Sequence, residues 1–403
     1  MKRFLQRKQK KPTGLNTPQN EYYENISARL GITQVILYLS LFAFVVLSFF
    51  RNTELITYQN FYYFIKDLNA SSESVFAFES DAVSYPTDSE QSFTLYRKGL
   101  AVAGNSAVTV FTATGRQTVS QNISYRHPVA VGAGKYLLVY ELGGTQYSLY
   151  NSYAQVFKGS SEQPILGAAV SDSGMYAIVS SSETYTSTVS LYSSDFSLLN
   201  RYNKVGYVMD VSINQKGTQV AILSSTPQNG VFSTELMLCE PGKNKEDAKE
   251  TVGDTFGWRC AYTSNGNIAV LHEKGVLYFA DDGEELSSFS FSGRTPAAVD
   301  MSADGVSVCL TSNAFFEENS IIVFDKSGKM LYNEDVSANA QQIARSGNSL
   351  YWLSEDGIHR LNLKNKEIAF SECDVSKKKL LAPSETEALI CSPQKAEYIN
   401  FDS

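Results

Sequence analysis

The stretch SDSGMYAIVS, residues 171–180, contains the unit that decides the fold: a small polar turn ending in Gly174, followed by an alternating apolar segment. The same unit recurs as VGAGKYLLVY, INQKGTQVAIL, TSNGNIAVL, SADGVSVCL and RSGNSLYWL. The turn glycines follow one another at intervals of 40, 43, 49, 39 and 42 residues; they are Gly134, Gly174, Gly217, Gly266, Gly305 and Gly347. Apolar alternation with period two, rich in Val, Ile and Tyr and bounded by Gly, Asn, Asp and Ser, predicts β-strands.

A second turn recurs after the next strand of each unit, as in FTATGR, FADDGEE and FDKSGK. One unit therefore holds four strands and two tight turns. Four-stranded units at a spacing of about 40–45 residues are typical of β-propeller blades. An array of sandwich domains fits poorly, because each sandwich needs about 100 residues.

The number of blades follows from the ends of the repeat array. Gly99 in YRKGLAVAG lies 35 residues before Gly134, and a glycine-free copy, SETEALICS, lies near Glu385. The last copy, LLAPSETEALICSPQKAEYINF, has room for three strands, and we expect SVFAFES (residues 74–80) to complete it and remove the open edge. We therefore predict an all-β fold for residues 73–403, a propeller with eight blades, or seven if one weak repeat is misread.

Residues Leu30 to Phe50 form an uncharged apolar run of 21 residues, about 30 Å as a helix, which matches the thickness of a bilayer. A cleavable signal peptide is the alternative, but the run ends in LSFFR rather than at an A-x-A-like site. We expect an uncleaved transmembrane helix at residues 30–50. The basic side faces the cytoplasm, so residues 1–29 would be a cytoplasmic tail and the propeller would be extracytoplasmic, in the plasma membrane.

Charge is distributed unevenly along the chain. Residues 1–29 carry a net charge of +5, whereas the part after residue 51 has 26 basic and 40 acidic residues. An acidic body argues against nucleic acid as a partner, because phosphate binding requires an excess of Lys and Arg. Residues 51–72, with aromatic residues at positions 61–64, are expected to form a juxtamembrane helix or linker.

Residues 74–402 resemble the broad WD40-like and quinoprotein-like propellers, without the Gly-His and Trp-Asp signatures of WD40 repeats. The whole layout, with a basic head, one span, the NFYYFIKDLNA segment and a propeller, resembles an uncharacterised family of bacterial, mostly Gram-positive, single-span membrane proteins. The resemblance implies a membrane-anchored extracytoplasmic propeller and no assigned activity.

Catalytic and metal motifs are missing from the sequence. There is no G-x-S-x-G elbow, P-loop or H-E-x-x-H, and the three histidines, His127, His272 and His359, fall in different repeats. The acidic turn ADDGEE lacks the spacing of an EF-hand loop. We predict no cofactor and no metal.

Among the five cysteines, Cys239–Cys260 and Cys373–Cys391 are possible bridges, while Cys309 and Cys391 lie in apolar strands and favour buried thiols.

The candidate binding residues lie where one repeat passes into the next, because in a propeller these connections reach the central funnel on one face. They include four polar side chains and one large aromatic: Arg126, His127, Trp258, Arg259 and Arg294. They would form a local positive funnel for an anionic ligand or for carboxylates of a partner. The alternative is that each Arg pairs with an acidic neighbour on the rim.

Loops on the same predicted face carry aromatic residues, namely Tyr185, Phe232, Phe315 and Phe316. Exposed aromatic residues on a rigid scaffold anchor protein interfaces. We therefore expect a non-enzymatic binding scaffold with an envelope or membrane protein partner. A propeller enzyme (a hydrolase, a lyase or a quinoprotein dehydrogenase) and an envelope sensor remain alternatives, although only two tryptophans argue against quinoprotein blades.

Overall fold

The computed structural model describes residues 30–40, 42–43, 82–243, 246–311, 319–336, 340–373 and 379–401. The chain divides into two compact units, Met1–Phe64 and Ile65–Ser403. In the first unit, residues 30–40 and 42–43 are helical. Among the described residues, none of the helices has both the length and the apolar character that a bilayer crossing requires. The rest of the predicted span, the tail 1–29 and the segment 51–72 lie outside the described residues.

The second unit consists of eight four-stranded antiparallel sheets. Their first strands are β2 (Gln91–Tyr96), β6 (Pro128–Gly132), β10 (Ile165–Val170), β14 (Tyr207–Ile213), β18 (Gly257–Tyr262), β22 (Thr295–Ser302), β26 (Gln342–Ser346) and β30 (Lys379–Leu381). Their second strands are β3 (Gly99–Gly104), β7 (Leu137–Glu141), β11 (Tyr176–Ser181), β15 (Val220–Gln228), β19 (Ile268–His272), β23 (Gly305–Thr311), β27 (Ser349–Leu353) and β31 (Glu387–Cys391).

The third strands are β4 (Ala107–Phe111), β8 (Gln146–Tyr150), β12 (Ser187–Tyr192), β16 (Val231–Cys239), β20 (Gly275–Phe279), β24 (Asn319–Phe324), β28 (Gly357–Asn362) and β32 (Lys395–Asn400). The fourth strands are β5 (Gln117–Asn122), β9 (Gln155–Ser160), β13 (Leu198–Lys204), β17 (Glu246–Gly253), β21 (Glu285–Ser290), β25 (Met330–Val336), β29 (Ile368–Glu372) and β1 (Ala82–Ser84). We call the sheets blades 1 to 8 in the order of their first strands.

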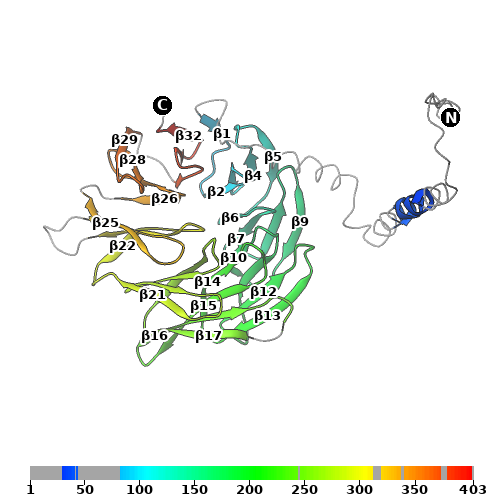
Figure 1. Ribbon diagram of the computed structural model, residues 1–403, viewed down its shortest axis with the longest axis horizontal. Helices are drawn as coiled ribbons and strands as arrows, with labels where there is room; N and C mark the ends of the chain where they lie inside the picture. The colour runs from blue at the N-terminus through cyan, green and yellow to red at the C-terminus, as the bar shows by residue number, and fades with distance from the viewer. Residues whose placement is uncertain are drawn as a thin grey trace, which may run out of the picture. The chain divides into compact units, whose positions relative to one another are not determined.

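The eight sheets form a ring, which confirms the eight-bladed propeller expected from the repeats. The first strands of neighbouring blades pack against one another all the way round, so they are the inner strands. In Figure 1 the colours progress around the ring from cyan to red. Each blade's outer strand connects to the next inner strand on one face, which also carries the turns between second and third strands. We call it the crossover face, and the opposite one the turn face.

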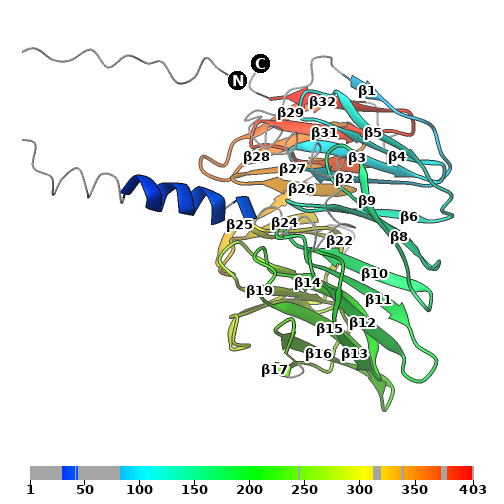
Figure 2. The same cartoon turned by 90° about the vertical axis from the view of Figure 1, so that its right-hand side faces the viewer.

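The ring closes through the two ends of the propeller sequence. Strand β1 pairs with β32, with Ala82 opposite Glu397 and Ser84 opposite Lys395, and the two lie side by side in Figures 1 and 2. An N-terminal strand thus completes the last blade as expected, but the strand that does so is Ala82–Ser84. The predicted closing segment, residues 74–80, lies outside the described residues.

The hydrophobic core is divided into eight clusters, one between each pair of neighbouring blades. Strand β7 shows why: Leu137 and Val139 pack toward blade 1, whereas Leu138 and Tyr140 pack toward blade 3. Successive side chains of a strand point to opposite faces of its sheet. A strand that is covered on both faces therefore has a continuous run of apolar residues in its sequence, and the second strands show such runs.

The repeated turn glycine is required by backbone geometry at Gly305, where φ is +126°. A Cβ atom there would lie 2.3 Å from the carbonyl oxygen of Phe324. Glycine is the residue that adopts positive φ without strain and allows such a close approach. Glycine is thus a steric requirement of the turn at Gly305.

The cysteines are not cross-linked in the two pairs considered above. Cys260, Cys309 and Cys391 are buried free thiols, so neither Cys239–Cys260 nor Cys373–Cys391 forms a bridge. Cys239 packs in the core between blades 3 and 4, and Cys260 in the core between blades 4 and 5. The two side chains therefore lie on opposite sides of blade 4.

Candidate functional site

Exposed large apolar side chains gather on one face of blades 2 to 4. In the described part of the propeller, fourteen such residues are exposed, and half of them lie on outer strands. The other half all lie on the crossover face: Leu142, Leu166, Tyr185, Val205, Tyr207, Val231 and Phe232. We call these seven residues the apolar arc.

Hydrogen bonds between neighbouring blades connect the members of the arc. The turn that carries Leu142 is joined to β10 by the N–H of Gly143, which donates to Ile165 at 2.8 Å. The turn that carries Tyr185 is joined to the next crossover, because the hydroxyl of Thr186 donates to the carbonyl oxygen of Val205. Val205 itself is 75% exposed. Hydrogen bonds therefore hold these turns of the arc on a rigid framework.

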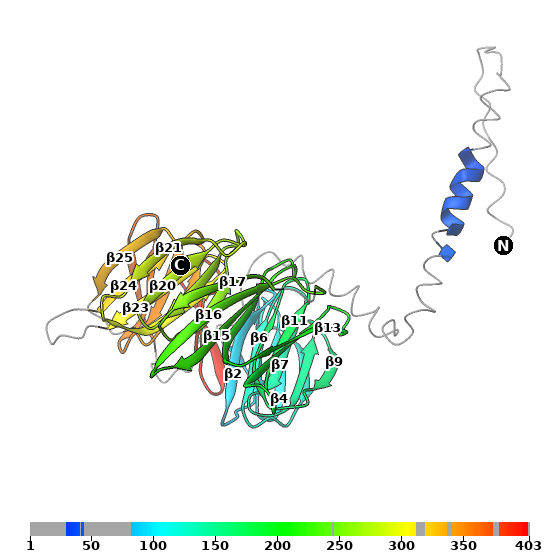
Figure 3. The same cartoon turned by 90° about the horizontal axis from the view of Figure 1, so that it is seen from below.

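The β15–β16 hairpin extends the arc. Its nine-residue strands are longer than the other second and third strands, and Figure 3 shows them side by side with β17. Asn229 and Gly230 at the tip have φ of +50° and +85°, as a two-residue type I′ turn requires. Phe232 meets the ring of Phe256 edge-on, with the ring centroids 5.1 Å apart, and Phe256 lies 6.2 Å from Trp258.

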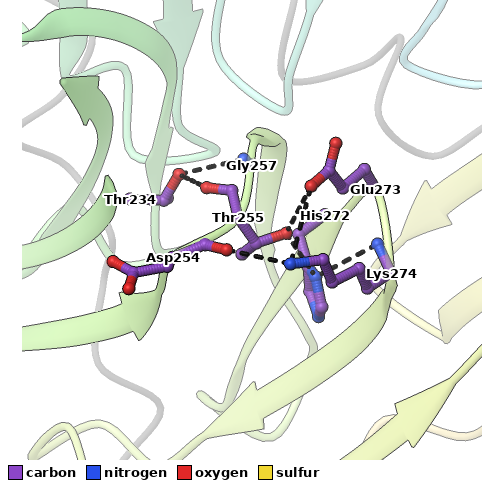
Figure 4. Close-up of polar contacts among 7 residues, drawn as sticks. All are labelled: Thr234, Asp254, Thr255, Gly257, His272, Glu273 and Lys274. Carbon is purple, nitrogen blue, oxygen red and sulfur yellow. Dashed lines mark hydrogen bonds and ion pairs between the residues drawn. The ribbon is translucent and has the colours of Figure 1, made fainter. Parts of the chain in front are cut away.

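A polar cluster beneath the hairpin fixes the crossover between blades 4 and 5 (Figure 4). The hydroxyl of Thr234 on β16 donates to the carbonyl oxygen of Thr255 at 2.6 Å and accepts the N–H of Gly257 at 3.0 Å. From blade 5, the Lys274 ammonium donates to the carbonyl oxygen of Asp254 at 2.9 Å. These bonds hold the backbone next to Phe256 from both sides.

The same cluster contains a hydroxyl, an imidazole and a carboxylate, but not in a nucleophilic arrangement. The Thr255 hydroxyl lies 3.2 Å from Nδ1 of His272 and 3.4 Å from the Glu273 carboxylate. In a catalytic triad the carboxylate orients the histidine from the side opposite the nucleophile, whereas here both groups contact the hydroxyl itself. Burial lowers the pKa of His272, and Nδ1 accepts the N–H of Lys274. We interpret the cluster as structural support for the crossover.

Charged side chains converge on the propeller axis. The charge of Arg259 on β18 acts on two carboxylates, Asp210 on β14 and Asp300 on β22. The charge of Lys379 in blade 8 also acts on Asp300 in blade 6, across the position of blade 7. Side chains of non-neighbouring blades come close only at the axis, so these groups lie near the axis, around which a propeller has its central channel.

Burial is the largest influence on both channel carboxylates and raises the pKa of Asp210 and of Asp300 to about 6. Nearby cations and backbone N–H groups only partly oppose this effect, since they favour the charged form. Oδ2 of Asp300 is inaccessible and has no hydrogen-bond partner among the described residues. The channel therefore combines two buried acids with two exposed cations, Arg259 and Lys379.

Arg126, His127 and Arg294 belong to other crossovers than the one that leads to Arg259. Arg126 and His127 are exposed in the crossover between blades 1 and 2, where the Arg126 N–H donates to Glu141 at 3.1 Å. Arg294 donates to the Ser320 hydroxyl at 2.7 Å within blade 6. No interaction among the three arginines is recorded in the described part of the chain. Phe315 and Phe316 lie outside the described residues.

Sequence reasoning missed most of the arc and both channel acids. Leu142, Val205 and Tyr207 sit at strand ends, where the alternating pattern gives no sign of which side faces solvent. Asp210 and Asp300 do carry a signal, because each places a charge inside an otherwise apolar inner strand, YVMDVSI and TPAAVDMS. A charge in such a strand is expected to face an axis or a partner group.

Comparisons with known proteins show a shared fold at low identity. The Sqt1 protein of Chaetomium thermophilum, solved bound to the N-terminus of ribosomal protein L10, superposes with a TM-score of 0.55 at 11% identity over 80% of this chain and 100% of that one. BamB of Moraxella catarrhalis gives 0.52 at 12% identity, covering 80% and 99% of the two chains. The C-terminal WD40 domain of Sif2 gives 0.57 at 11% identity, covering 81% and 99%.

No curated protein matches this sequence significantly. One family profile does match, over residues 78–401, which is most of the chain. The matched range contains all the described strands of the propeller, from β1 to β32. The chain therefore belongs to the family of unknown function DUF5711.

Proposed function

We propose that this protein is a membrane-tethered, extracytoplasmic propeller that binds a protein partner of the cell envelope through the apolar arc. The observation that carries the proposal is the clustering of exposed apolar side chains. Seven large ones lie on the crossover face of blades 2 to 4, whereas the other seven described in the propeller are spread over the outer strands of blades 3, 5, 6 and 7. Exposed apolar patches that are rimmed by polar residues mark interaction sites.

In this proposal residues 30–50 span the plasma membrane and residues 1–29 remain in the cytoplasm. Support comes from the uncharged apolar run and from the basic residues before it. Residues 51–72 would then link the span to the propeller. A partner in the membrane or envelope is favoured because the tether holds the propeller near that surface.

The fold supports a binding role. Sqt1 has the same propeller fold and was solved with a segment of another protein bound. The arc offers Tyr185, Tyr207 and Phe232 as aromatic anchors on a rigid framework, and aromatic side chains dominate the energetics of protein interfaces. Fold likeness alone does not assign a function, so the arc carries the argument.

Site-specific photocrosslinking tests this function. A photoreactive phenylalanine analogue is placed at Tyr185, Tyr207 or Phe232 in the full-length protein in its own membranes. The matched control places the analogue at Lys98, which is exposed on the turn face. We expect one discrete partner band from the three arc positions and no such band from Lys98.

Charge substitution gives the second arm of the test. Val205→Glu combined with Tyr207→Glu should abolish the crosslink from Tyr185 and leave the thermal unfolding midpoint unchanged, because both side chains are exposed. An equal crosslink from Lys98, or an arc crosslink that survives both charges, would contradict the proposal.

Protease accessibility tests the proposed topology separately. Protease added to intact cells should digest the propeller and spare a tag placed on residues 1–29. A protected propeller would overturn the extracytoplasmic location without affecting the argument for the arc.

An anionic ligand at the channel mouth is the second candidate. It is favoured by the exposed guanidinium of Arg259, which forms no ion pair in the described part of the protein. Charge reversal of Arg126, Arg259 and Arg294, one at a time, distinguishes a shared funnel from a single cation. Loss of anion binding only with Arg259→Glu would place the ligand on the axis.

A further inference from the structure

The turn face carries a ring of hydrogen bonds between neighbouring blades. We call the turn between the first and second strands of a blade its inner turn. Bonds join successive inner turns at six seams, with donor–acceptor distances from 2.6 to 3.2 Å. The pairs are Arg97–Gly134, Gly134–Asp172, Ser173–Gln215, Ser264–Ala303, Gly347–Asp304 and Asn348–Glu385.

The acceptor at three of these seams is a carboxylate. Asp172 accepts the N–H of Gly134 at 2.7 Å, Asp304 accepts that of Gly347 at 2.8 Å, and Glu385 accepts that of Asn348 at 2.9 Å. Charge-assisted hydrogen bonds of this kind are stronger than neutral ones. A carboxylate is thus a favoured acceptor for the inner-turn backbone.

Two of the eight seams lack such a bond between the described inner turns, namely the seam between blades 8 and 1 and the seam between blades 4 and 5. No hydrogen bond joins the inner turn at residues 214–219 to the one at 263–267 in the described chain. A pocket of about 500 Å³ opens there, between these turns and Asp281. That volume falls in the range of small-molecule sites.

A comparison of the inner turns shows which groups at the seam between blades 4 and 5 lack the partners that their equivalents in blade 3 have. The inner turns of blades 3, 4 and 5 share one geometry, because Gly174, Gly217 and Gly266 each donate to the residue three positions earlier. Lys216 therefore corresponds to Ser173, whose N–H donates to the next blade at 3.2 Å. Lys216 forms no hydrogen bond or ion pair among the described residues. In blade 5, Ser264 occupies the position that the carboxylate residue Asp172 occupies in blade 3.

The other wall of the pocket offers an opposite charge. The carbonyl oxygen of Asp281 accepts the Gln219 amide at 2.7 Å, which fixes the position of this residue, while its carboxylate is exposed and forms no ion pair in the described chain. The second acid of the pocket, Glu240, is paired with Lys243. The pocket therefore presents one available cation and one available anion, on different blades.

The same pocket is also lined by the amide side chains of Gln219 and Asn265. Oε1 of Gln219 accepts the Tyr262 hydroxyl at 3.1 Å, and Oδ1 of Asn265 accepts the Thr263 hydroxyl at 2.6 Å, which leaves the Asn265 NH₂ group available. We propose that this pocket binds a small zwitterion of amino-acid to dipeptide size, with its carboxylate at Lys216 and its ammonium group at Asp281. The proposal is independent of the apolar arc, which lies on the opposite face.

Saturation-transfer NMR on the full-length protein in nanodiscs tests this site, with L-alanyl-L-alanine as the probe. Three analogues separate the charges: N-acetyl-L-alanine keeps only the carboxylate, L-alanine amide keeps only the ammonium group, and N-acetyl-L-alanine amide has neither. We expect the dipeptide to bind and each singly charged analogue to bind about tenfold more weakly, as the loss of one charge-assisted hydrogen bond predicts.

Variants locate the binding. Ser264→Asp restores the carboxylate of blade 3 and should occupy the Lys216 end, so dipeptide binding should fall about tenfold or more. Lys216→Gln and Asp281→Asn should weaken it to a similar extent. Lys98→Gln removes an exposed charge from the same face outside the pocket and should leave it unchanged. Circular dichroism verifies folding, and Lys216→Gln serves in place of Ser264→Asp if the latter unfolds.

Either of two results would overturn the proposal. One is that the dipeptide shows no transfer at millimolar concentration, or binds no better than N-acetyl-L-alanine amide. The other is binding that all three pocket variants retain.

Discussion

The backbone N–H of Cys260 donates to Oδ2 of Asp210 at 2.9 Å, across the seam between blades 4 and 5. Each inner strand has one edge without a strand partner, and its N–H groups need acceptors. Side chains of the preceding inner strand supply them elsewhere too: Ser212 accepts the N–H of Tyr262 at 3.2 Å, and Gln342 accepts that of Leu380 at 2.8 Å. Polar residues in the inner strands thus join the blades around the axis.

The substitution Asp300→Asn should stabilise the protein at pH 7.5 and about half as much at pH 5. Burial raises the pKa of Asp300 to about 6 from 3.8, so the native state binds more protons than the unfolded state between these values. The contribution of this group to stability is therefore full below about pH 4 and is lost as the pH rises through about 6. The size is at most on the order of 3 kcal/mol, measured by chemical denaturation at both pH values.

Asp254→Asn is the control for this experiment, because Asp254 is exposed in a crossover. It should change stability by less than about 0.5 kcal/mol at either pH. An Asp300→Asn protein that is less stable than the parent at pH 7.5 would show instead that Arg259 and Lys379 fully compensate the buried charge.

Two turn glycines provide a matched pair for backbone strain. Gly266 and Gly305 both have positive φ, at +93° and +126°, but a Cβ at Gly266 meets nothing within 4 Å, whereas one at Gly305 meets the Phe324 carbonyl oxygen. Gly266→Ala should cost about 1 kcal/mol, and Gly305→Ala about 2 kcal/mol more, because the neighbouring backbone must move. Equal losses in denaturant midpoints would mean that the contact at Gly305 relaxes freely.

The closing strand is tested by placing the same charge at two adjacent positions. Val83 is 6% exposed in the core between blades 8 and 1, whereas the next residue, Ser84, is exposed. Val83→Asp should lower the free energy of unfolding by about 3 kcal/mol, because it buries an unpaired charge. Ser84→Asp should remain within about 0.5 kcal/mol of the parent. Similar thermal midpoints for the two variants would argue against a sealed last blade.

The two tryptophans report on different environments. Trp352 is 2% exposed, whereas Trp258 is partly exposed beside Phe256. Acrylamide should therefore quench the fluorescence of Trp352→Phe, in which Trp258 remains, several times more strongly than that of Trp258→Phe. Adding Phe232→Ala to the Trp352→Phe protein should increase quenching further, since Phe232 covers Phe256. Unchanged quenching would mean that the hairpin tip does not shield this region.

The repeats predicted the blades because they are governed by local sterics and by burial. Gly305 is required by its turn, and the strand of Leu137 to Tyr140 is buried on both faces. The site was harder to predict. Arg126, Arg259 and Arg294 look alike in sequence, and only the ring shows that Arg259 lies on the axis while Arg294 bonds within its own blade. The exposure of Val205 depends on how far neighbouring turns extend, which no single repeat encodes.

The closing strand has a mechanical consequence. Strand β1 runs antiparallel to β32, so it enters the propeller at the turn face and ends at the crossover face. A pulling force between the preceding chain and a partner held at the apolar arc would load β1 along its length. Three residue pairs share that load in shear, so the last blade is where the ring would open under tension.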